Sequence, residues 1–294
     1  KLALMNKYGL RCADCGYLTP EDAYYVDCPK CKGFLEVELS EVPATPVDTR
    51  FKSIFRFHPV MPYDPVTEDL SRYEFLDATP VVAAEAISDR LGVELYYKDE
   101  VRMPSGTWKD REGFVSIHRL LKNGVNDLVI FSSGNTATSL ARSASIIKGP
   151  RLHIVVPKAS ERRIKTYAEF FDPEFVKLHF FAGSNDECIL EAGKLAREMG
   201  YQIEGGFSNY ARREGLKLLA LEAIFDWGHG VDWYVQPVAG GIGIYSYHKA
   251  YRDLGREAVL AVVAGPQAVR VVRVHPSVAV VVHAVAALVG LALA

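Results

Sequence analysis

Hydrophobic and polar residues follow two patterns along this chain, and each pattern predicts a kind of element. Residues 34–39 alternate apolar and acidic side chains, which predicts a strand with one exposed face. From Thr79 onward, short apolar runs alternate with helical periods, several of which end at glycine. Strands are predicted at 93–97, 128–131, 152–156 and 233–236, and helices at 110–121, 138–147, 187–199, 215–227 and 245–254. The alternation predicts an α/β fold with a largely parallel sheet that helices cover on both faces.

Two segments lie outside this alternation. Residues 43–65 hold five prolines, which predicts an extended, partly packed connector because each proline removes a backbone donor. Residues 257–294 contain no Phe, Tyr or Trp, and 277–294 form an apolar run, broken only by His283, that is long enough to cross a membrane. No Trp, Tyr or cluster of basic residues flanks this run, so we expect it to be buried in protein rather than in a bilayer.

Composition narrows the class of partner. The 294 residues include 34 Lys and Arg against 36 Asp and Glu, which gives a net charge of −2, and 49% of them are hydrophobic. This balance is typical of a soluble enzyme and gives no sign of a nucleic-acid or membrane partner. No basic segment followed by an apolar one opens the sequence, so we expect a cytoplasmic protein.

Four of the five cysteines are clustered. Cys12, Cys15, Cys28 and Cys31 form two C-x-x-C pairs separated by twelve residues. Without an export signal, such a quartet favours a metal site over disulfides. Four thiolates complete a tetrahedral Zn²⁺ site and leave no open position, so the predicted zinc is structural. A metal-free remnant or a redox pair is the alternative.

The first candidate for chemistry is the segment P-S-G-T-W-K-D-R at residues 104–111. It follows a predicted strand and opens a predicted helix, so Lys109 is expected near the carboxyl edge of the sheet, where open α/β folds bind ligands. A buried amine loses the solvation of its charged form and can attack an aldehyde. The alternative is a solvated surface lysine.

Two further segments join a predicted strand to a predicted helix. Residues 131–139, F-S-S-G-N-T-A-T-S, place hydroxyls and backbone N–H groups at a helix N-terminus, which suits either an anion or a simple helix cap. Residues 236–243, Q-P-V-A-G-G-I-G, offer successive glycine N–H groups that can hold a phosphate. Their spacing differs from the dinucleotide-binding fingerprint.

In their order and spacing, these three segments resemble the motifs of the fold type II family of pyridoxal-phosphate (PLP) enzymes, and those of threonine synthase most closely. The resemblance implies two open, largely parallel, twisted sheets flanked by helices, with PLP in the cleft between two domains. It implies that Lys109 forms a Schiff base with the cofactor and that Asn135 bonds to its ring oxygen. The cofactor phosphate would lie against Ala239, Gly240, Gly241, Ile242 and Gly243.

The resemblance also implies a substrate site. Residues 76–81, L-D-A-T-P-V, and 209–217, N-Y-A-R-R-E-G-L-K, are similar to threonine synthase segments. Arg212 would bind the substrate phosphate, for which its planar fork is suited. The substrate carboxylate would be held by Ser132, Ser133 and Thr136.

The expected substrate is a small amino acid, and the expected reaction converts O-phosphohomoserine and water to threonine and phosphate. One alternative keeps the cofactor but eliminates or replaces a group at Cβ of serine, phosphoserine or threonine, as in dehydratases and in cysteine or cysteate synthases. Another is a non-catalytic homologue. The resemblance further implies a homodimer with a zinc-ribbon-like knuckle at 1–40, a large PLP-binding domain at 41–112 and 206–294, and a small substrate-binding domain at 113–205.

Overall fold

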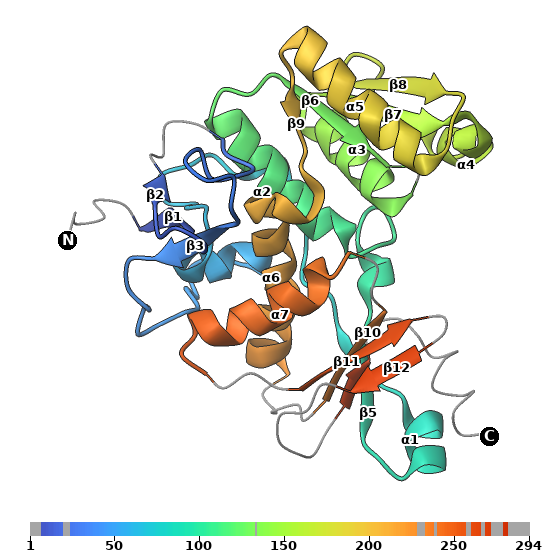
Figure 1. Cartoon of the computed structure of the whole chain (residues 1–294). Coiled ribbons are helices and arrows are strands. Elements are labelled where there is room, and N and C mark those ends of the chain that lie inside the picture. Colours follow the sequence, from blue (N-terminus) through green and yellow to red (C-terminus); the bar gives the residue numbers. More distant parts are fainter. Residues whose placement is uncertain are drawn as a thin grey trace. The chain divides into compact units, whose positions relative to one another are not determined.

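A computed structural model describes residues 7–19, 24–132, 134–227, 233–237, 240–256, 260–265, 268–271 and 279–281 (Figure 1). The chain divides into two compact units. The first comprises Lys1–Glu41, Met61–Leu76 and Lys109–Gly215, and the second comprises Val42–Val60, Asp77–Trp108 and Leu216–Ala294. The three-part division expected from the sequence stays a prediction.

The first unit contains a four-stranded parallel sheet in the order β8-β7-β6-β9. The strands are β6 (Asp127–Phe131), β7 (Arg151–Pro157), β8 (Val176–Phe181) and β9 (Gln202–Ile203). Successive residues of β6 and β7 are buried, as expected for parallel strands that are covered on both faces. Helices α2 (Lys109–Lys122) and α3 (Asn135–Ile147) pack against each other, and α3 and α5 (Asn185–Met199) both contact the sheet.

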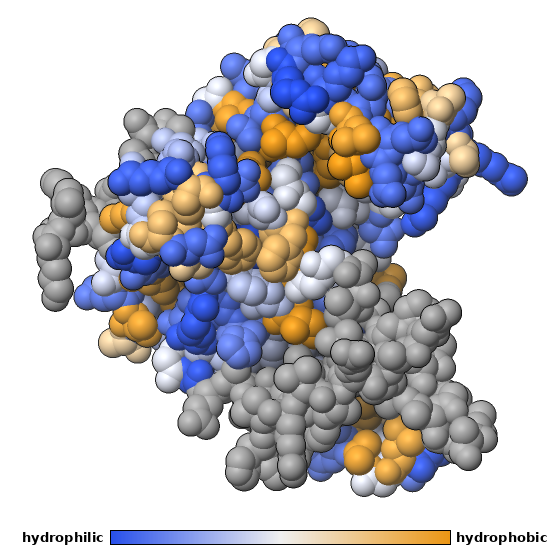
Figure 2. Space-filling view, viewed as in Figure 1, coloured by the Kyte–Doolittle hydropathy of each residue, from blue (hydrophilic) through white to orange (hydrophobic). Residues whose placement is uncertain are grey.

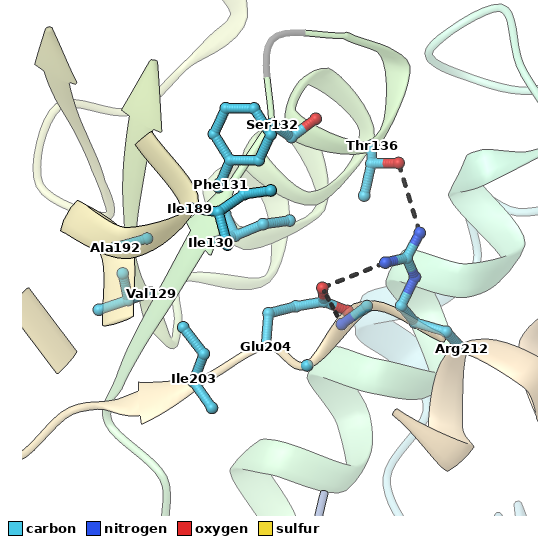
Figure 3. Close-up of a pocket in the computed structure, with 12 residues that line it drawn as sticks. Val129, Ile130, Phe131, Ser132, Thr136, Ile189, Ala192, Ile203, Glu204 and Arg212 are labelled. Carbon is cyan, nitrogen blue, oxygen red and sulfur yellow. Dashed lines mark hydrogen bonds and ion pairs between the residues drawn. The ribbon is translucent and has the colours of Figure 1, made fainter. Parts of the chain in front are cut away.

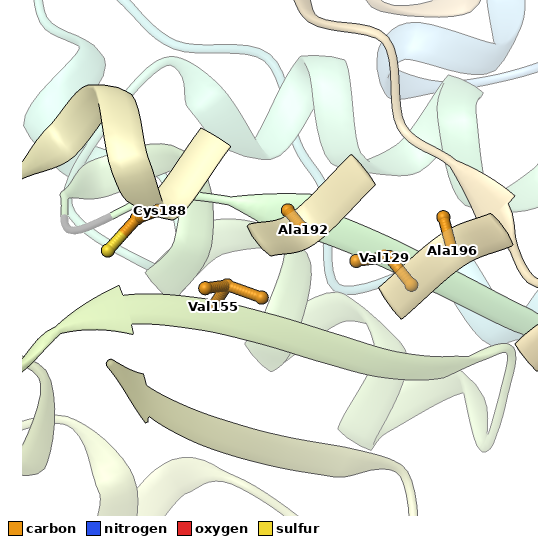
Figure 4. Packing of buried hydrophobic residues seen from close by; sticks show 5 residues of the cluster. All are labelled: Val129, Val155, Cys188, Ala192 and Ala196. Carbon is orange, nitrogen blue, oxygen red and sulfur yellow. The ribbon is translucent and has the colours of Figure 1, made fainter. Parts of the chain in front are cut away.

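Helix α5 shows how local sequence sets this packing. Ser184 and Glu187 form a capping box at its start, and Gly200 ends it in the left-handed region with a φ of 68°. Its buried face places Cys188 and two alanines against Val129 and Val155 of the sheet (Figure 4). Small side chains at these positions let the helix lie close to the strands.

The N-terminal residues of the first unit form a small antiparallel sheet in the order β2-β1-β3. Its strands are β1 (Tyr8–Cys12), β2 (Leu18–Thr19) and β3 (Leu35–Leu39). Cys12, Cys28 and Leu35 are buried together, and Tyr17 and Tyr25 pack on them. We call residues 7–39 the cysteine knuckle.

The second unit contains a six-stranded sheet in the order β12-β11-β10-β13-β5-β4. The inner four strands pair in parallel, and both edge strands, β4 and β12, are antiparallel to their neighbours. The strands are β4 (Val81–Ala83), β5 (Leu95–Lys98), β10 (Trp233–Pro237), β11 (Leu260–Gly265), β12 (Ala268–Val271) and β13 (Ala279–Val281). The two largely parallel sheets and the N-terminal cysteine cluster confirm the predicted fold class.

The remaining helices complete the two units. Helix α6 (Tyr210–Asp226) begins in the first unit and ends in the second, and α7 (Ile242–Asp253) lies in the second. The other α-helices are α1 (Glu85–Leu91) and α4 (Glu161–Lys165). The 3₁₀ helices are η1 (Ser53–Val60), η2 (Ser71–Tyr73), η3 (Glu100–Arg102), η4 (Lys158–Ser160), η5 (Ala168–Phe170) and η6 (Gly206–Ser208).

Three expectations from the sequence need correction. Helix α6 begins five residues earlier than predicted, because the Asn209 side chain accepts from the N–H of Ala211 at 3.0 Å and caps the helix. Helix α7 begins at Ile242 rather than 245. The proline-rich connector is not wholly extended, because η1 buries Ile54, Phe57 and Val60 on one side of a 3₁₀ helix.

The apolar C-terminal run lies mostly outside the described residues. Of residues 277–294, the structure describes 279–281, which form β13. Among the residues that are described, no helix is long and apolar enough to cross a membrane.

Candidate active site

Lys109 is the first residue of α2, at the end of the turn that its motif predicted. Gly106 enables this turn with a φ of 73°. The Lys109 side chain is about one-fifth exposed, and its Nζ donates to Oε1 of Glu112 at 2.6 Å. The predicted lysine is therefore partly buried and held by an ion pair, rather than solvated at the surface.

Glu112 joins this lysine to the predicted substrate arginine. Its side chain is 1% exposed, and its second oxygen, Oε2, accepts from Nε of Arg212 at 2.7 Å. Burial pushes the pKa of Glu112 upward, but Arg212 and Lys109 outweigh burial and hold the pKa below its usual value. One ionised carboxylate thus links the two cations.

Arg212 is buried, and each of its three guanidinium nitrogens makes a hydrogen bond. Its NH1 donates to Oε2 of Glu204 at 3.1 Å, and its NH2 donates to the Thr136 hydroxyl at 3.4 Å (Figure 3). Burial opposes its charge, but Glu112 and Glu204 raise its pKa above the ordinary arginine value. The guanidinium therefore stays charged and points at the start of α3.

Arg212, Glu204 and Thr136 line a cavity of about 400 Å³ in the first unit, which we call the Arg212 pocket, whereas Lys109 and Glu112 are not among its lining residues. This volume lies within the usual range for small-molecule sites. Apolar residues line one side and polar residues the other (Figure 3). The apolar lining is Val129, Ile130, Phe131, Ile189, Ala192 and Ile203, and the rest is Ser132, Thr136, Glu204, Gly205, Gly206 and Arg212.

Exposed apolar side chains continue outward from this pocket. Ile189 and Leu190 in the first turns of α5 are 52% and 72% exposed. Figure 2 shows hydrophobic surface over this helix among mostly hydrophilic residues. The apolar lining of the pocket therefore reaches the surface of the first unit.

The predicted serine- and asparagine-bearing segment forms the start of α3. The Ser132 hydroxyl accepts from the N–H groups of Gly134 and Ala137, at 3.3 and 3.2 Å, and so helps to cap the helix. Thr136 and Ser132 line the pocket, whereas Asn135, the first helical residue, is exposed. Ser133 lies outside the described residues.

The predicted phosphate loop lies in the second unit, at the start of α7. Gly240 is exposed, and Gly241 caps the helix with a φ of 79°. Gly243 is packed tightly, since a Cβ there would lie 2.1 Å from Nε2 of Gln236. Ile242 is buried, and Ala239 lies outside the described residues.

These residues fit PLP. The first N–H groups of a helix have no partner within it, so the α7 N-terminus beside an exposed glycine can receive a phosphate. Lys109 supplies a partly buried amine for the aldehyde. Lys109 and the α7 N-terminus thus each have the chemistry that the predicted role requires.

The four clustered cysteines fit a metal ion. Their sulfur atoms all lie within 4.8 Å of one another, with Cys12 and Cys31 3.5 Å apart and Cys15 and Cys28 3.7 Å apart. A tetrahedral Zn²⁺ with bonds of about 2.3 Å separates its sulfurs by about 3.8 Å. The quartet is therefore already arranged to bind such an ion.

Sequence reasoning missed the two carboxylates of the site. Glu112 lies three residues after Lys109 on the same helix, a spacing at which side chains meet, and this was the available signal. Glu204 had no comparable signal, because its partner Arg212 is reached only when η6 folds the chain back.

Comparison with known proteins establishes the family. The family model for "Pyridoxal-phosphate dependent enzyme" matches residues 74–288. The chain belongs to this family. The match includes Lys109, the start of α3, Arg212 and the glycine loop.

Curated relatives have two kinds of name. A cysteate synthase from Methanococcoides burtonii is 30% identical over 81% of this chain and 57% of its own length. A threonine synthase from Methanosarcina acetivorans is 26% identical over 84% of this chain and 60% of its own length. The chain thus spans about three-fifths of the length of these curated relatives.

The fold is also shared with solved structures. The processed form of threonine deaminase isoform 2 from Solanum lycopersicum matches with a TM-score of 0.59 and 21% identity, over 67% of this chain and 53% of that chain. At this identity the match supports the fold alone.

Proposed function

We propose that this chain is a PLP-dependent β-replacement enzyme of the cysteate synthase type. Relatives with that name reach 30% identity, whereas the threonine synthase relative is 26% identical, so the comparisons favour the β-replacement alternative over the threonine synthase prediction. Cysteate carries a sulfonate on Cβ. Its formation from O-phosphoserine breaks the Cβ–O bond, releases phosphate, and forms a Cβ–S bond with the sulfur lone pair of sulfite.

The cofactor would be held by residues of the three motifs that the sequence identified. Lys109 would bind the aldehyde carbon, Asn135 the ring oxygen, and the described glycines 240, 241 and 243 the phosphate. Bound PLP draws electrons from Cα of an amino acid. The freed Lys109 amine would then move the Cα proton, with Glu112 beside it to stabilise its charged form.

The observation that carries this proposal is the buried Arg212 at the polar side of the pocket. Its charge faces Thr136, and Ser132 lines the same pocket, so these polar groups suit the oxygens of an anionic substrate group. Both the leaving phosphate and the incoming sulfite are anions, so the fixed guanidinium of Arg212 would stabilise either anion when it is bound. The opposite side of the pocket is lined by apolar side chains.

We further propose that the cysteine knuckle binds one Zn²⁺. Four thiolates would fill its coordination shell, so the ion would be structural and take no part in the reaction. The spacing of the four sulfur atoms supports this assignment.

The decisive assay compares phosphate release from O-phosphoserine with and without sulfite, and from O-phosphohomoserine. We expect sulfite-dependent release from O-phosphoserine, with cysteate identified by mass. Release only from O-phosphohomoserine, with threonine as product, would favour the threonine synthase reaction. Ammonia release without sulfite would indicate β-elimination, and PLP binding without any turnover would indicate a non-catalytic homologue.

A further inference from the structure

Residues 24–27, the described end of the loop between the two C-x-x-C pairs, reach the wall of the Arg212 pocket. Tyr24 lies in this loop, is buried, and donates its hydroxyl to Oδ1 of Asn209 at 2.5 Å. Burial raises the pKa of Tyr24 well above its usual value, so the phenol stays a donor. Asn209 belongs to the segment that leads into α6.

Two more hydrogen bonds connect Asn209 to the pocket. Its Nδ2 donates to Oε1 of Glu204 at 3.1 Å, and the other oxygen of Glu204 accepts from Arg212 at 3.1 Å. Figure 3 shows Glu204 and Thr136 both directed at the guanidinium. Tyr24, Asn209, Glu204 and Arg212 are all at most 7% exposed, so water does not compete with these bonds.

Packing contacts also connect the cysteine knuckle to the wall of the pocket. Gly205 lines the pocket on one side and meets Val26 of the knuckle on the other, where a Cβ would lie 2.3 Å from Cγ1 of Val26. The φ of Gly205 is 89°, which also requires glycine. Phe34 of the knuckle stacks on Phe207, with ring centroids 5.6 Å apart. The segment 204–207 is therefore held between the pocket and the knuckle.

The knuckle is small, and two backbone bonds close each of its C-x-x-C turns. In the first turn Gly16 donates to Cys12 at 3.0 Å and Cys12 to Tyr17 at 2.8 Å, and in the second turn Lys32 donates to Cys28 and Cys28 to Gly33, both at 2.9 Å. Its sheet has three short strands, and so small a unit needs a metal or disulfides to stay folded. The position of Tyr24 thus depends on what the four thiolates bind.

We propose that the metal-loaded cysteine knuckle positions Arg212 through Tyr24, Asn209 and Glu204, so that loss of the metal weakens binding of the anionic substrate. Tyr24 and Asn209 are then positioning residues, and neither touches the substrate. The part of this proposal that concerns substrate affinity rests on the proposed function, whereas the coupling between knuckle and pocket wall does not.

Hydrogen exchange tests the coupling directly. We compare the backbone amides of 204–213 in the full chain with Zn²⁺ and after its removal by a chelator, and take 151–157 of β7 as the reference. We expect exchange of 204–213 to rise at least about fivefold, as for loss of one buried hydrogen bond, with β7 unchanged. If the knuckle opens while 204–213 keeps its protection, the coupling does not exist.

Tyr24→Phe separates this route from general unfolding. It keeps the ring and all four thiolates, and Tyr17→Phe makes the same change elsewhere in the knuckle. With Zn²⁺ bound, we expect Tyr24→Phe alone to speed exchange of 204–213 and to raise the KM for O-phosphoserine about fivefold, with kcat nearly unchanged. Equal exchange in the two variants overturns the proposal, even if metal removal unfolds the chain. If the chain does not turn over O-phosphoserine but the two variants still differ in hydrogen exchange, the result contradicts only the proposed function.

Discussion

Glu112 holds the two cations of the site with its two oxygens, and it does so while almost completely buried. A carboxylate in this position has a Coulombic gain from both partners that exceeds its own desolvation cost. Removing its charge would leave the buried Arg212 with Glu204 as its one counter-ion among the described residues. Stability and site geometry are therefore linked through one side chain.

We predict that Glu112→Gln lowers the free energy of unfolding by about 3 kcal/mol at pH 7. The folded-state pKa of Glu112 is lowered, so its contribution is complete above the ordinary Glu value of about 4.3 and is lost as the pH falls through the lower folded value. Urea unfolding of the variant and of wild type at pH 7 measures the loss of stability, and the same comparison at pH 3 measures its dependence on pH. Glu161→Gln, which breaks surface pairs with Lys158 and Lys165, is the control and should leave the free energy of unfolding nearly unchanged. A difference between Glu112→Gln and wild type that persists unchanged at pH 3 would contradict the electrostatic explanation.

Lys109 is the residue on which the cofactor assignment depends. We predict that Lys109→Ala abolishes the visible absorption band that the wild-type chain gains with PLP, because no other residue would bind the aldehyde carbon in its place. Lys158→Ala, at an exposed lysine of the same unit, should leave the band intact. An unchanged band in Lys109→Ala would assign the covalent link to another lysine.

For individual residues of the site, the sequence indicated candidates that lie in short motifs. It did not indicate residues whose role depends on contacts between distant parts of the chain. Lys109, Thr136 and Arg212 were chosen from short segments, and the structure brings Thr136 and Arg212 together across 76 residues. The Glu112–Arg212 bond spans 100 residues, so no local pattern could have revealed it.

The backbones of helices α2 and α6 are in close contact where the helices cross, and one glycine makes this contact possible. A Cβ on Gly215 would lie 2.2 Å from the carbonyl oxygen of Arg111. The close contact keeps Glu112, which follows Arg111 on α2, within reach of Arg212, which lies one turn before Gly215 on α6. The crossing of these two helices is thus the element-level cause of the site geometry.

We predict that Gly215→Ala destabilises the chain by about 2 kcal/mol, because backbone must move to admit the methyl group. Gly193→Ala is the matched control, since it lies inside α5 and its nearest neighbour is the end of the flexible Arg197 side chain at 3.4 Å. There we expect a gain of roughly 0.5–1 kcal/mol from helix propensity. Thermal unfolding distinguishes the two, and equal effects would refute the close crossing.

Elements were easier to predict than their ends. The apolar runs in β6 and β7 identified buried parallel strands, because they are continuous and short. The β8 strand was missed, although residues 176–180 alternate apolar and polar side chains, the pattern of a strand with one exposed face. The start of α6 was placed late because its cap, Asn209, is held by Tyr24, a contact from a distant part of the chain.

For the molecule as a whole, the cysteine knuckle adds a structural dependence on metal. We predict one Zn²⁺ per chain by elemental analysis, and a lower midpoint of thermal unfolding after chelation, because the apo knuckle loses its four bonds. Cys15→Ser should remove the ion, whereas Cys188→Ala, in the core under α5, should retain it. Full zinc content in Cys15→Ser would mean that the ion lies elsewhere.

The four linked charges of the site have a consequence for ligand binding. Lys109 and Arg212 carry two positive charges, and Glu112 and Glu204 carry two negative ones, so the group sums to zero before any ligand arrives. A ligand with two negative charges would leave this low-dielectric region with an uncompensated excess, which is costly. We therefore expect such a ligand to bring a proton with it, and its calorimetric heat of binding to vary with the ionisation enthalpy of the buffer.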